Sequence, residues 1–222
     1  MKLSKRTLEL LKNFSNINQS IAFKKGNRMR TMSVLRNIVA DAIVDETFPI
    51  DFAINDLNQF QNSISLFNDP ELIFDNDKYL KIVEGGNTLK YYFGDLSLIQ
   101  SPTKEISLPS NEVSFSLNKD SVLNGILKAS SIQSLPDLSV IGDEKDIKLL
   151  VRDKLNPTSN EYAVKVGDTT KNFEFNFKIE NLKLYSGSYN VEISKALVSK
   201  FKHKDLDLTY WIALEPDFKY YV

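Results

Sequence analysis

The chain has 222 residues, enough for one large or two small domains, and its formal net charge of −1 argues against coating nucleic acid through bulk positive charge. The absence of cysteine excludes a disulfide framework, a thiolate metal site and a cysteine nucleophile. The 14 Phe and 9 Tyr residues favour a sheet-rich structure. Apolar runs are too short for a membrane span, and Glu9, Lys12 and Asn13 interrupt the apolar stretch that a signal peptide needs.

Residues 4–17 are predicted to form an amphipathic helix that starts at the capping residue Ser4. Its basic face has two open interpretations, a solvated surface or a surface that meets a polyanion. Strands are expected near residues 20–24, 28–33 and 36–44. The apolar side consists of Leu3, Leu8, Leu10, Leu11, Phe14 and Ile17, and the polar side of Lys2, Lys5, Arg6, Glu9 and Lys12.

The alternating stretch 48–54 is predicted to be a strand that runs into a helix over residues 56–67, with Asp56 as its N-cap. The outer face of this helix carries no charge, which is unusual for an exposed helix. Such a face suits a surface close to a polyanion or one packed against another subunit. Its residues are Asn58, Gln59, Asn62, Ser63 and Ser65, and strands are expected to follow at 71–74, 78–84 and 88–93.

The stretch Phe48–Leu57 recurs as Phe173–Leu182, and Leu3–Leu8 resembles Leu117–Val122. The order and spacing of the two pairs indicate an internal duplication, although two unrelated domains could share such junctions. We therefore expect one domain over residues 1–95, a connecting loop over 96–110 with Pro102 and Pro109, and a second domain over 111–222.

The second half is expected to repeat the order of helices and strands of the first half. A helix is predicted over residues 119–132 and a short one after Asn181, before Ser186-Gly187-Ser188. The tail 215–222 is expected to be loosely held. Strands are expected near 112–117, 138–141, 146–152, 161–166, 171–177, 189–193, 196–201 and 206–214.

Motifs for catalysis are missing from the sequence. It has no glycine-rich phosphate loop, and its one histidine, His203, lies in a polar stretch that predicts an exposed turn. Acidic residues are spread over turns rather than paired on a rigid element. We therefore expect neither an enzyme nor a bound cofactor, although carboxylates brought together by folding stay an alternative.

The start of the chain resembles the sliding clamps of T-even-type bacteriophages, in Met1–Lys5, Leu10–Phe14 and Ile17-Asn18. Looser matches are Asp56-Leu57-Asn58 with Phe60, Phe175-Asn176-Phe177 with Ile179, Gly187-Ser188-Tyr189 and Ala213-Leu214-Glu215. The resemblance implies an α+β DNA-clamp fold, with two similar domains that each pack two helices on antiparallel sheets. It also implies a homotrimeric ring of six domains, similar to PCNA, with helices around the hole and sheets outside.

Such a ring encircles duplex DNA without reading its sequence and tethers the phage DNA polymerase. An ATP-driven clamp loader places it, and late-transcription sigma and co-activator proteins contact it, in the cytoplasm of the infected host. The DNA-facing candidates are Lys2, Lys5, Arg6, Lys12, Lys119, Lys128, Lys178 and Lys183, because phosphate contacts by Lys and Arg are independent of sequence.

By the same resemblance, partner peptides would enter an apolar pocket at Leu98, Ile99, Leu214 and Pro216. Subunits would pair through edge strands that contain Thr88, Tyr91, Tyr92 and Phe93 on one side and Tyr162, Val164 and Val166 on the other. The rival hypothesis is a sheet-rich phage structural or assembly protein with no DNA role.

Overall fold

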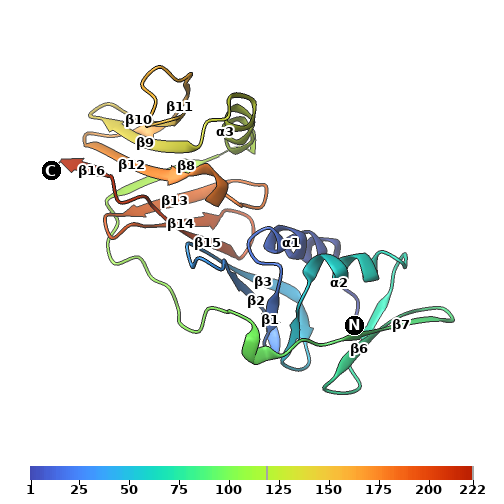
Figure 1. The fold of residues 1–222 in the computed structure, drawn as a ribbon. Coiled ribbons are helices and arrows are strands. Elements are labelled where there is room, and N and C mark those ends of the chain that lie inside the picture. Colours follow the sequence, from blue (N-terminus) through green and yellow to red (C-terminus); the bar gives the residue numbers. More distant parts are fainter. Residues whose placement is uncertain (119, 222) are drawn as a thin grey trace. The chain divides into compact units, whose positions relative to one another are not determined.

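The computed structural model describes residues 1–118 and 120–221, which form two units, Met1–Glu105 and Ile106–Val222. Each unit combines α-helix with antiparallel strands, so the expected α+β class is confirmed (Figure 1). The division falls inside the segment 96–110, whose regular structure is the 3-10 turn η1 (Leu96–Leu98). Among the described residues, no helix is long and apolar enough to cross a membrane.

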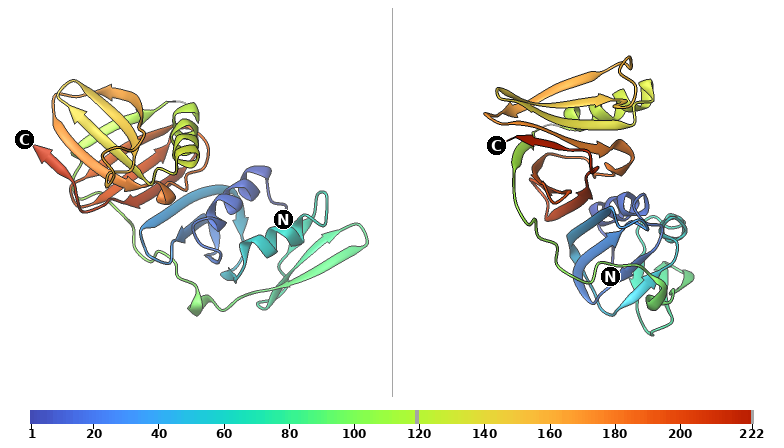
Figure 2. Two further views of the ribbon diagram at one scale, coloured as in Figure 1. Left: turned by 45° about the horizontal axis from the view of Figure 1, so that its top comes forward. Right: turned by 60° about the vertical axis from the view of Figure 1, so that its left-hand side comes forward.

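The first unit places two helices side by side next to three groups of strands (Figures 1 and 2). Strand β1 pairs with β4, β2 pairs with β3, and β5, β6 and β7 form a sheet in chain order. The elements are α1 (Lys5–Ser15), β1 (Ile21–Phe23), β2 (Gly26–Met32), β3 (Ile38–Phe48), β4 (Phe52–Ile54), α2 (Leu57–Ile64), β5 (Glu71–Ile73), β6 (Tyr79–Glu84) and β7 (Asn87–Tyr92).

The predicted continuous strand 48–54 is wrong, because the chain bends between β3 and β4. Pro49 has no N–H to give to a ladder and restricts the backbone of the residue before it. The Asp51 carboxylate then accepts hydrogen bonds from Lys25 N–H and Lys24 Nζ, each at 2.8 Å. These bonds fix the bend, and the alternation of the stretch is shared by two strands.

The second unit contains two antiparallel sheets and one α-helix among its described residues. One sheet has the order β11-β10-β9-β12-β16, and the other strands of this unit follow the order β15-β14-β13-β8. The elements are β8 (Val113–Leu117), α3 (Asp120–Gln133), β9 (Asp137–Asp143), β10 (Asp146–Arg152), β11 (Tyr162–Asp168), β12 (Asn172–Lys178), η2 (Ile179–Asn181), β13 (Tyr189–Ser194), β14 (Val198–His203), β15 (Leu208–Ala213) and β16 (Lys219–Tyr221).

The α-helix expected after Asn181 is wrong. The chain makes the 3-10 turn η2 up to Asn181 and then leaves helical geometry. The N–H of Lys183 donates to the carbonyl of Asn181 at 2.9 Å, and the N–H of Tyr185 donates to the hydroxyl of Tyr210 at 3.1 Å. Because partners outside a helix take these backbone donors, the second copy of the repeated stretch ends in a turn and a loop.

Two expectations about the end of the chain are also wrong. The tail is not loosely held, because β16 pairs with β12 and Phe218 stacks on Phe175 with 5.3 Å between ring centroids. His203 is not exposed but buried at the end of β14. Its Nδ1 accepts hydrogen bonds from the N–H groups of Asp205 and Leu206, each at 3.1 Å, so the turn around the ring provides its polar partners.

The repeated stretch supplies core residues to both units. Phe52 and Phe177 occupy equivalent positions in the two copies, and both are buried. Phe52 stacks on Phe23 at 4.4 Å, whereas Phe177 contacts Phe201 edge-on at 6.0 Å. Aromatic pairs of this kind bury large apolar areas and favour specific geometries. The similarity between the copies therefore reflects two separate aromatic cores.

Candidate functional site

The start of α1 is fixed by hydrogen bonds within its first turn and to strand β3. Ser4 caps the helix, as predicted, by accepting the Thr7 N–H at 3.2 Å. Glu46 of β3 accepts the Ser4 N–H and, at 2.6 Å, the Thr7 hydroxyl. Burial raises the pKa of Glu46, but these hydrogen bonds outweigh it and hold the pKa below its ordinary value. Strand β3 thus anchors the helix end that carries the predicted basic face.

The outer face of α1 carries Lys5, Glu9 and Lys12, while Leu10, Leu11 and Phe14 are buried. Lys5 lies 3.8 Å from Glu9, so the acid within the predicted basic face is paired with a cation one turn away. Lys12 is exposed and forms no ion pair with any side chain that the structure describes.

Two further cations near α1 are held by acids from other elements. Lys2 forms an ion pair with Asp69 in the loop between α2 and β5, and Arg6 forms one with Asp45 of β3. The hydrogen bond that Lys2 donates to Asp69 raises the pKa of Lys2. Lys2 and Arg6 are therefore not free charges in this structure, a pairing that the sequence did not reveal.

Helix α2 presents a neutral, exposed face next to α1. Asp56 caps it, as predicted, by accepting the N–H groups of Asn58 and Gln59 at 2.9 and 3.0 Å. The Gln59 N–H and the Gln19 side chain hold the pKa of Asp56 below its ordinary value. Asn58, Gln59 and Asn62 point away from the buried Leu57, Phe60 and Ile64. The uncharged face predicted for this helix is thus a real exposed surface.

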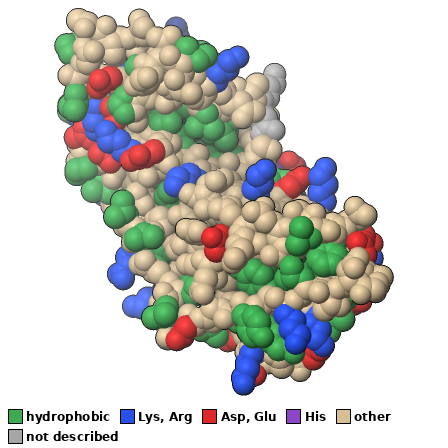
Figure 3. Space-filling view, turned by 45° about the vertical axis from the view of Figure 1, so that its right-hand side comes forward, with side chains coloured by type: hydrophobic (Ala, Val, Ile, Leu, Met, Phe, Trp, Pro, Cys, Tyr) green, Lys and Arg blue, Asp and Glu red, His purple; other side chains and the backbone are tan. Residues whose placement is uncertain are grey.

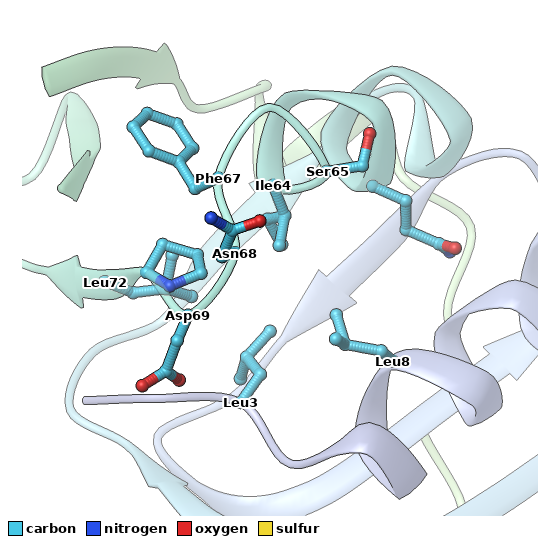
Figure 4. Close-up of a pocket in the computed structure, with 10 residues that line it drawn as sticks. Leu3, Leu8, Ile64, Ser65, Phe67, Asn68, Asp69 and Leu72 are labelled. Atoms are coloured by element: carbon cyan, nitrogen blue, oxygen red, sulfur yellow. The ribbon is translucent and has the colours of Figure 1, made fainter. Parts of the chain in front are cut away.

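A pocket of about 250 Å³ separates the N-terminal segment from the end of α2. Figure 4 shows Leu3, Leu8, Ile64 and Leu72 around it, with the Asp69 carboxylate beside the N-terminal segment. Leu3 packs among apolar side chains, which brings the neighbouring Lys2 next to Asp69.

In the second unit the predicted DNA-facing residues have different surroundings. Lys128 is exposed on α3 and makes no ion pair with a described side chain. Lys178 lies 2.6 Å from Asp137, whose side chain is 1% exposed. Lys183 is half-buried and engaged in an interaction, and Lys119 lies outside the described residues.

Each unit has a sheet edge without a neighbouring strand in the described chain. Strand β7 is the last strand of β5-β6-β7, and β11 is the first strand of β11-β10-β9-β12-β16. Tyr92 is 66% exposed on β7, and Tyr162 and Val166 lie on β11. Tyr91 is buried, with its hydroxyl donating to the Asp56 carbonyl at 3.2 Å. Thr88 is exposed, and Phe93 and Val164 are half-buried.

The residues predicted for a partner pocket fall in both units. Ile99 lines a pocket of about 600 Å³ together with Leu96, Arg28 and Arg30, whereas Leu98 is exposed. In the second unit Leu214 is buried and Pro216 is exposed.

Sequence reasoning missed the basic lining of this pocket. The alternation Arg28-Met29-Arg30 on β2, with Met29 buried, was the available signal. Arg28 donates to Glu105 at 2.7 and 2.8 Å and holds the pKa of Glu105 below its ordinary value. The connecting segment is thereby fastened to β2.

Charges on the surface are mostly arranged as pairs of opposite sign. On the face in Figure 3, lysine and arginine side chains lie close to acidic ones in several places. Among the described residues, no group of three or more His, Cys, Asp or Glu side chains could hold a metal ion. The exposed faces of α1 and α2 and the edge strands β7 and β11 are thus the candidate interaction surfaces.

Comparison with solved structures identifies the fold. Proliferating cell nuclear antigen from Entamoeba histolytica superposes with a TM-score of 0.68 at 11% identity, over 94% of both chains. The PCNA of Thermococcus kodakaraensis gives a TM-score of 0.67 at 13% identity, over 95% of this chain and 96% of that one. The fold is therefore that of the sliding clamps, and the fold predicted from the resemblance is confirmed.

Sequence comparison identifies the family. The model of the DNA polymerase processivity factor family matches residues 2–100. The sliding clamp of Vibrio phage KVP40 is 31% identical over 97% of this chain and 99% of its own length. The sliding clamp of Enterobacteria phage T4 is 30% identical over 98% of both chains. The chain belongs to the family of T4-type phage sliding clamps, the DNA polymerase processivity factors.

Proposed function

We propose that the chain assembles into a homotrimeric ring that encircles duplex DNA and tethers the phage replicative polymerase. The clamp fold and the family membership support this role. The observation that carries the proposal is that each unit offers an edge strand, β7 in the first and β11 in the second. An edge strand presents unpaired N–H and C=O groups, so β7 and β11 can each accept a strand from another protomer.

Pairing of β7 in one protomer with β11 in the next closes the ring. Such a contact joins two different surfaces of the same kind of chain. The assembly closes into a ring when a whole number of protomer-to-protomer rotations adds up to a full turn. The domain ranges 1–95 and 111–222 provide two clamp domains per protomer, so three protomers give six. The pairing residues are Thr88, Tyr91, Tyr92 and Phe93 on one edge and Tyr162, Val164 and Val166 on the other.

The DNA-facing surface consists of the outer faces of α1, α2 and α3. Lys12 and Lys128 supply cations without internal partners among the described residues, and α2 supplies neutral amides. Phosphate attraction by lysine does not depend on base sequence, so it holds DNA without stopping movement along it. The other candidates, Lys2, Lys5, Arg6, Lys119, Lys178 and Lys183, complete this proposed surface.

Reversing the charge of Lys12 and Lys128 tests the DNA face. We expect the variant with Lys12→Glu and Lys128→Glu to remain a folded trimer but to be retained poorly on nicked circular DNA by gel filtration. Control charge reversals at Lys78 and Lys145, which lie exposed in turns next to β6 and β10, should leave retention unchanged. Equal retention of all proteins would count against the assignment.

Retention on circular but not on linear DNA also separates a clamp from the rival sheet-rich structural protein, because only an encircling ring slides off free ends. An ATP-driven clamp loader is the proposed means of placing the ring. The pocket lined by Ile99 in the first unit is one proposed docking site for polymerase and loader peptides. Leu98 of the first unit, and separately Leu214 and Pro216 of the second, are further proposed contact residues. Late-transcription sigma and co-activator proteins are further proposed partners, in the cytoplasm of the infected host.

A further inference from the structure

The cations beside α1 fall into two kinds that the sequence does not distinguish. Lys12 forms no ion pair with a described side chain, whereas Lys2 and Arg6 are each held by an acid from a distant part of the first unit. Asp69 and Asp45 lie 67 and 39 residues along the chain from their partners, so the pairs are a product of the fold.

We infer that Asp45 and Asp69 are built-in counterions that compete with DNA phosphates for Arg6 and Lys2. By weakening phosphate binding at this part of the surface, they keep the ring mobile on DNA. The inference rests on the proposed function, because it takes the face of α1 to meet DNA. It adds that acids, as well as cations, set how tightly that face holds the duplex.

Both acids are held where their partners need them. The N–H groups of Asn68 and Asp69 donate to the Glu84 carboxylate at 3.0 and 2.7 Å, which fixes the loop after α2 against β6. Leu3 packs in the pocket beside this loop (Figure 4). Asp45 is part of β3, next to the Glu46 that anchors α1. The geometry of each pair thus follows from packing on both sides.

Both pairs are nevertheless open to exchange with a phosphate. The side chains of Asp45 and Asp69 are 70% and 73% exposed, so water surrounds them and the attraction within each pair is screened. A phosphate that approaches can replace the carboxylate. The phosphate must first displace the carboxylate, however. Because the carboxylate is part of the protein, it stays near the cation and does not diffuse away as a released salt ion does. Each paired cation therefore contributes less to DNA binding than a free one.

Counterion release gives this difference a measurable size. The slope of log affinity against log salt changes by about 0.9 for each phosphate that a protein neutralises on duplex DNA. Freeing Lys2 and Arg6 should therefore steepen the slope by up to about 1.8. Between about 50 and 200 mM salt, that change corresponds to a difference in affinity of up to about tenfold.

The experiment compares the intact protein with its Asp45→Asn and Asp69→Asn double variant. Binding to a short fluorescein-labelled DNA duplex is followed by anisotropy over a range of NaCl concentrations. Diffusion of the loaded ring on stretched DNA is followed by single-molecule fluorescence. We expect a steeper salt slope, tighter binding at low salt and slower diffusion. Because exposed ion pairs add little to stability, thermal unfolding should be nearly unchanged.

A matched control tests whether a general change in net charge is enough to steepen the salt slope and slow diffusion. Asp75 pairs with Lys81 at 2.5 Å, in the turn before β6 and away from α1 in the chain. The double variant Asp75→Asn and Asp143→Asn removes the same charge from two acids that pair with lysines, since Asp143 pairs with Lys148 at 2.7 Å. We expect this control to keep the salt slope and diffusion of the unmodified protein.

The outcomes separate the inference from the proposed function. If Lys12→Glu and Lys128→Glu impair retention on DNA while the Asp45 and Asp69 variant behaves as the unmodified protein, the DNA face stands and the counterion role is wrong. If the control double variant tightens binding as much, net charge alone acts and the inference is again wrong. If Lys12→Glu and Lys128→Glu also have no effect, the assignment of the DNA face itself is overturned.

Discussion

Replacing Lys178 by methionine separates a structural role of this residue from a DNA-binding role. Lys178 was predicted to face DNA, but its ammonium group lies 2.6 Å from the carboxylate of Asp137. Asp137 is almost completely buried, and its other oxygen accepts the Lys154 N–H at 3.1 Å. Methionine keeps most of the aliphatic length of lysine and removes the charge. The variant therefore leaves a buried carboxylate with its backbone partner alone.

The expected cost follows from the burial of the Asp137 carboxylate. Removing one member of a buried ion pair costs about 3 to 5 kcal/mol, because the remaining charge is uncompensated. The Lys178 side chain is 32% exposed, so water can reach the site and reduce the penalty. We expect a loss of about 2 to 3 kcal/mol. For a chain of this size, that lowers the unfolding temperature by about 5 to 10 °C.

Calorimetry and urea unfolding measure this loss of stability. Asp137→Asn, which removes the charge of the other member of the ion pair, is the matched control variant. In the double variant with Lys178→Met the buried charge is absent, so part of the lost stability should return. The hydrogen bond to Asp137 raises the pKa of Lys178 above the ordinary 10.5. The stabilisation is therefore complete below pH 10.5 and is lost as the pH rises through the raised value. The difference between the unmodified protein and Lys178→Met should shrink at strongly alkaline pH.

A different result would refute this reasoning. If Lys178→Met unfolds at the temperature of the unmodified protein but is retained poorly on circular DNA, Lys178 contacts DNA and its pairing with Asp137 contributes no stability. If the double variant is no more stable than Lys178→Met alone, the buried carboxylate is not the source of the cost.

Two further predictions concern the subunit edge and the anchor of α1. The Phe93 N–H donates to the Lys78 carbonyl, and N–H groups alternate in direction along a strand, so the Tyr92 N–H points away from β6. Tyr92→Pro should therefore leave the hydrogen bonds between β6 and β7 intact and yield folded monomers in sedimentation. Persistent trimers would exclude this edge from the interface. Glu46→Gln should cost about 1 kcal/mol at neutral pH, because neutral hydrogen bonds replace charged ones. Since the pKa of Glu46 is lowered, its stabilisation is present above the ordinary value of 4.5 and lost as the pH falls through the lowered one. Melting curves should converge in acid, and a constant difference would contradict this.

Local patterns in the sequence determined most of the elements. Alternation located the strands. Ser4 and Asp56 marked the starts of α1 and α2, because a side-chain oxygen at the N-cap accepts a hydrogen bond from the unpaired N–H groups of the first helical turn. The opening residues and the two-domain layout carried the resemblance to phage clamps. The edges at β7 and β11 were named correctly as edge strands, although that inference came from the resemblance.

Contacts between distant residues decided the rest. Asp51 closes the bend after Phe48, Phe218 draws the tail onto β12, and backbone donors near Tyr185 find partners that end the expected helix. The same holds for the charges. Sequence shows that Lys2, Arg6 and Lys178 are cations, but only the fold brings Asp69, Asp45 and Asp137 to them, because a cation's partner depends on which loops and strands meet in space.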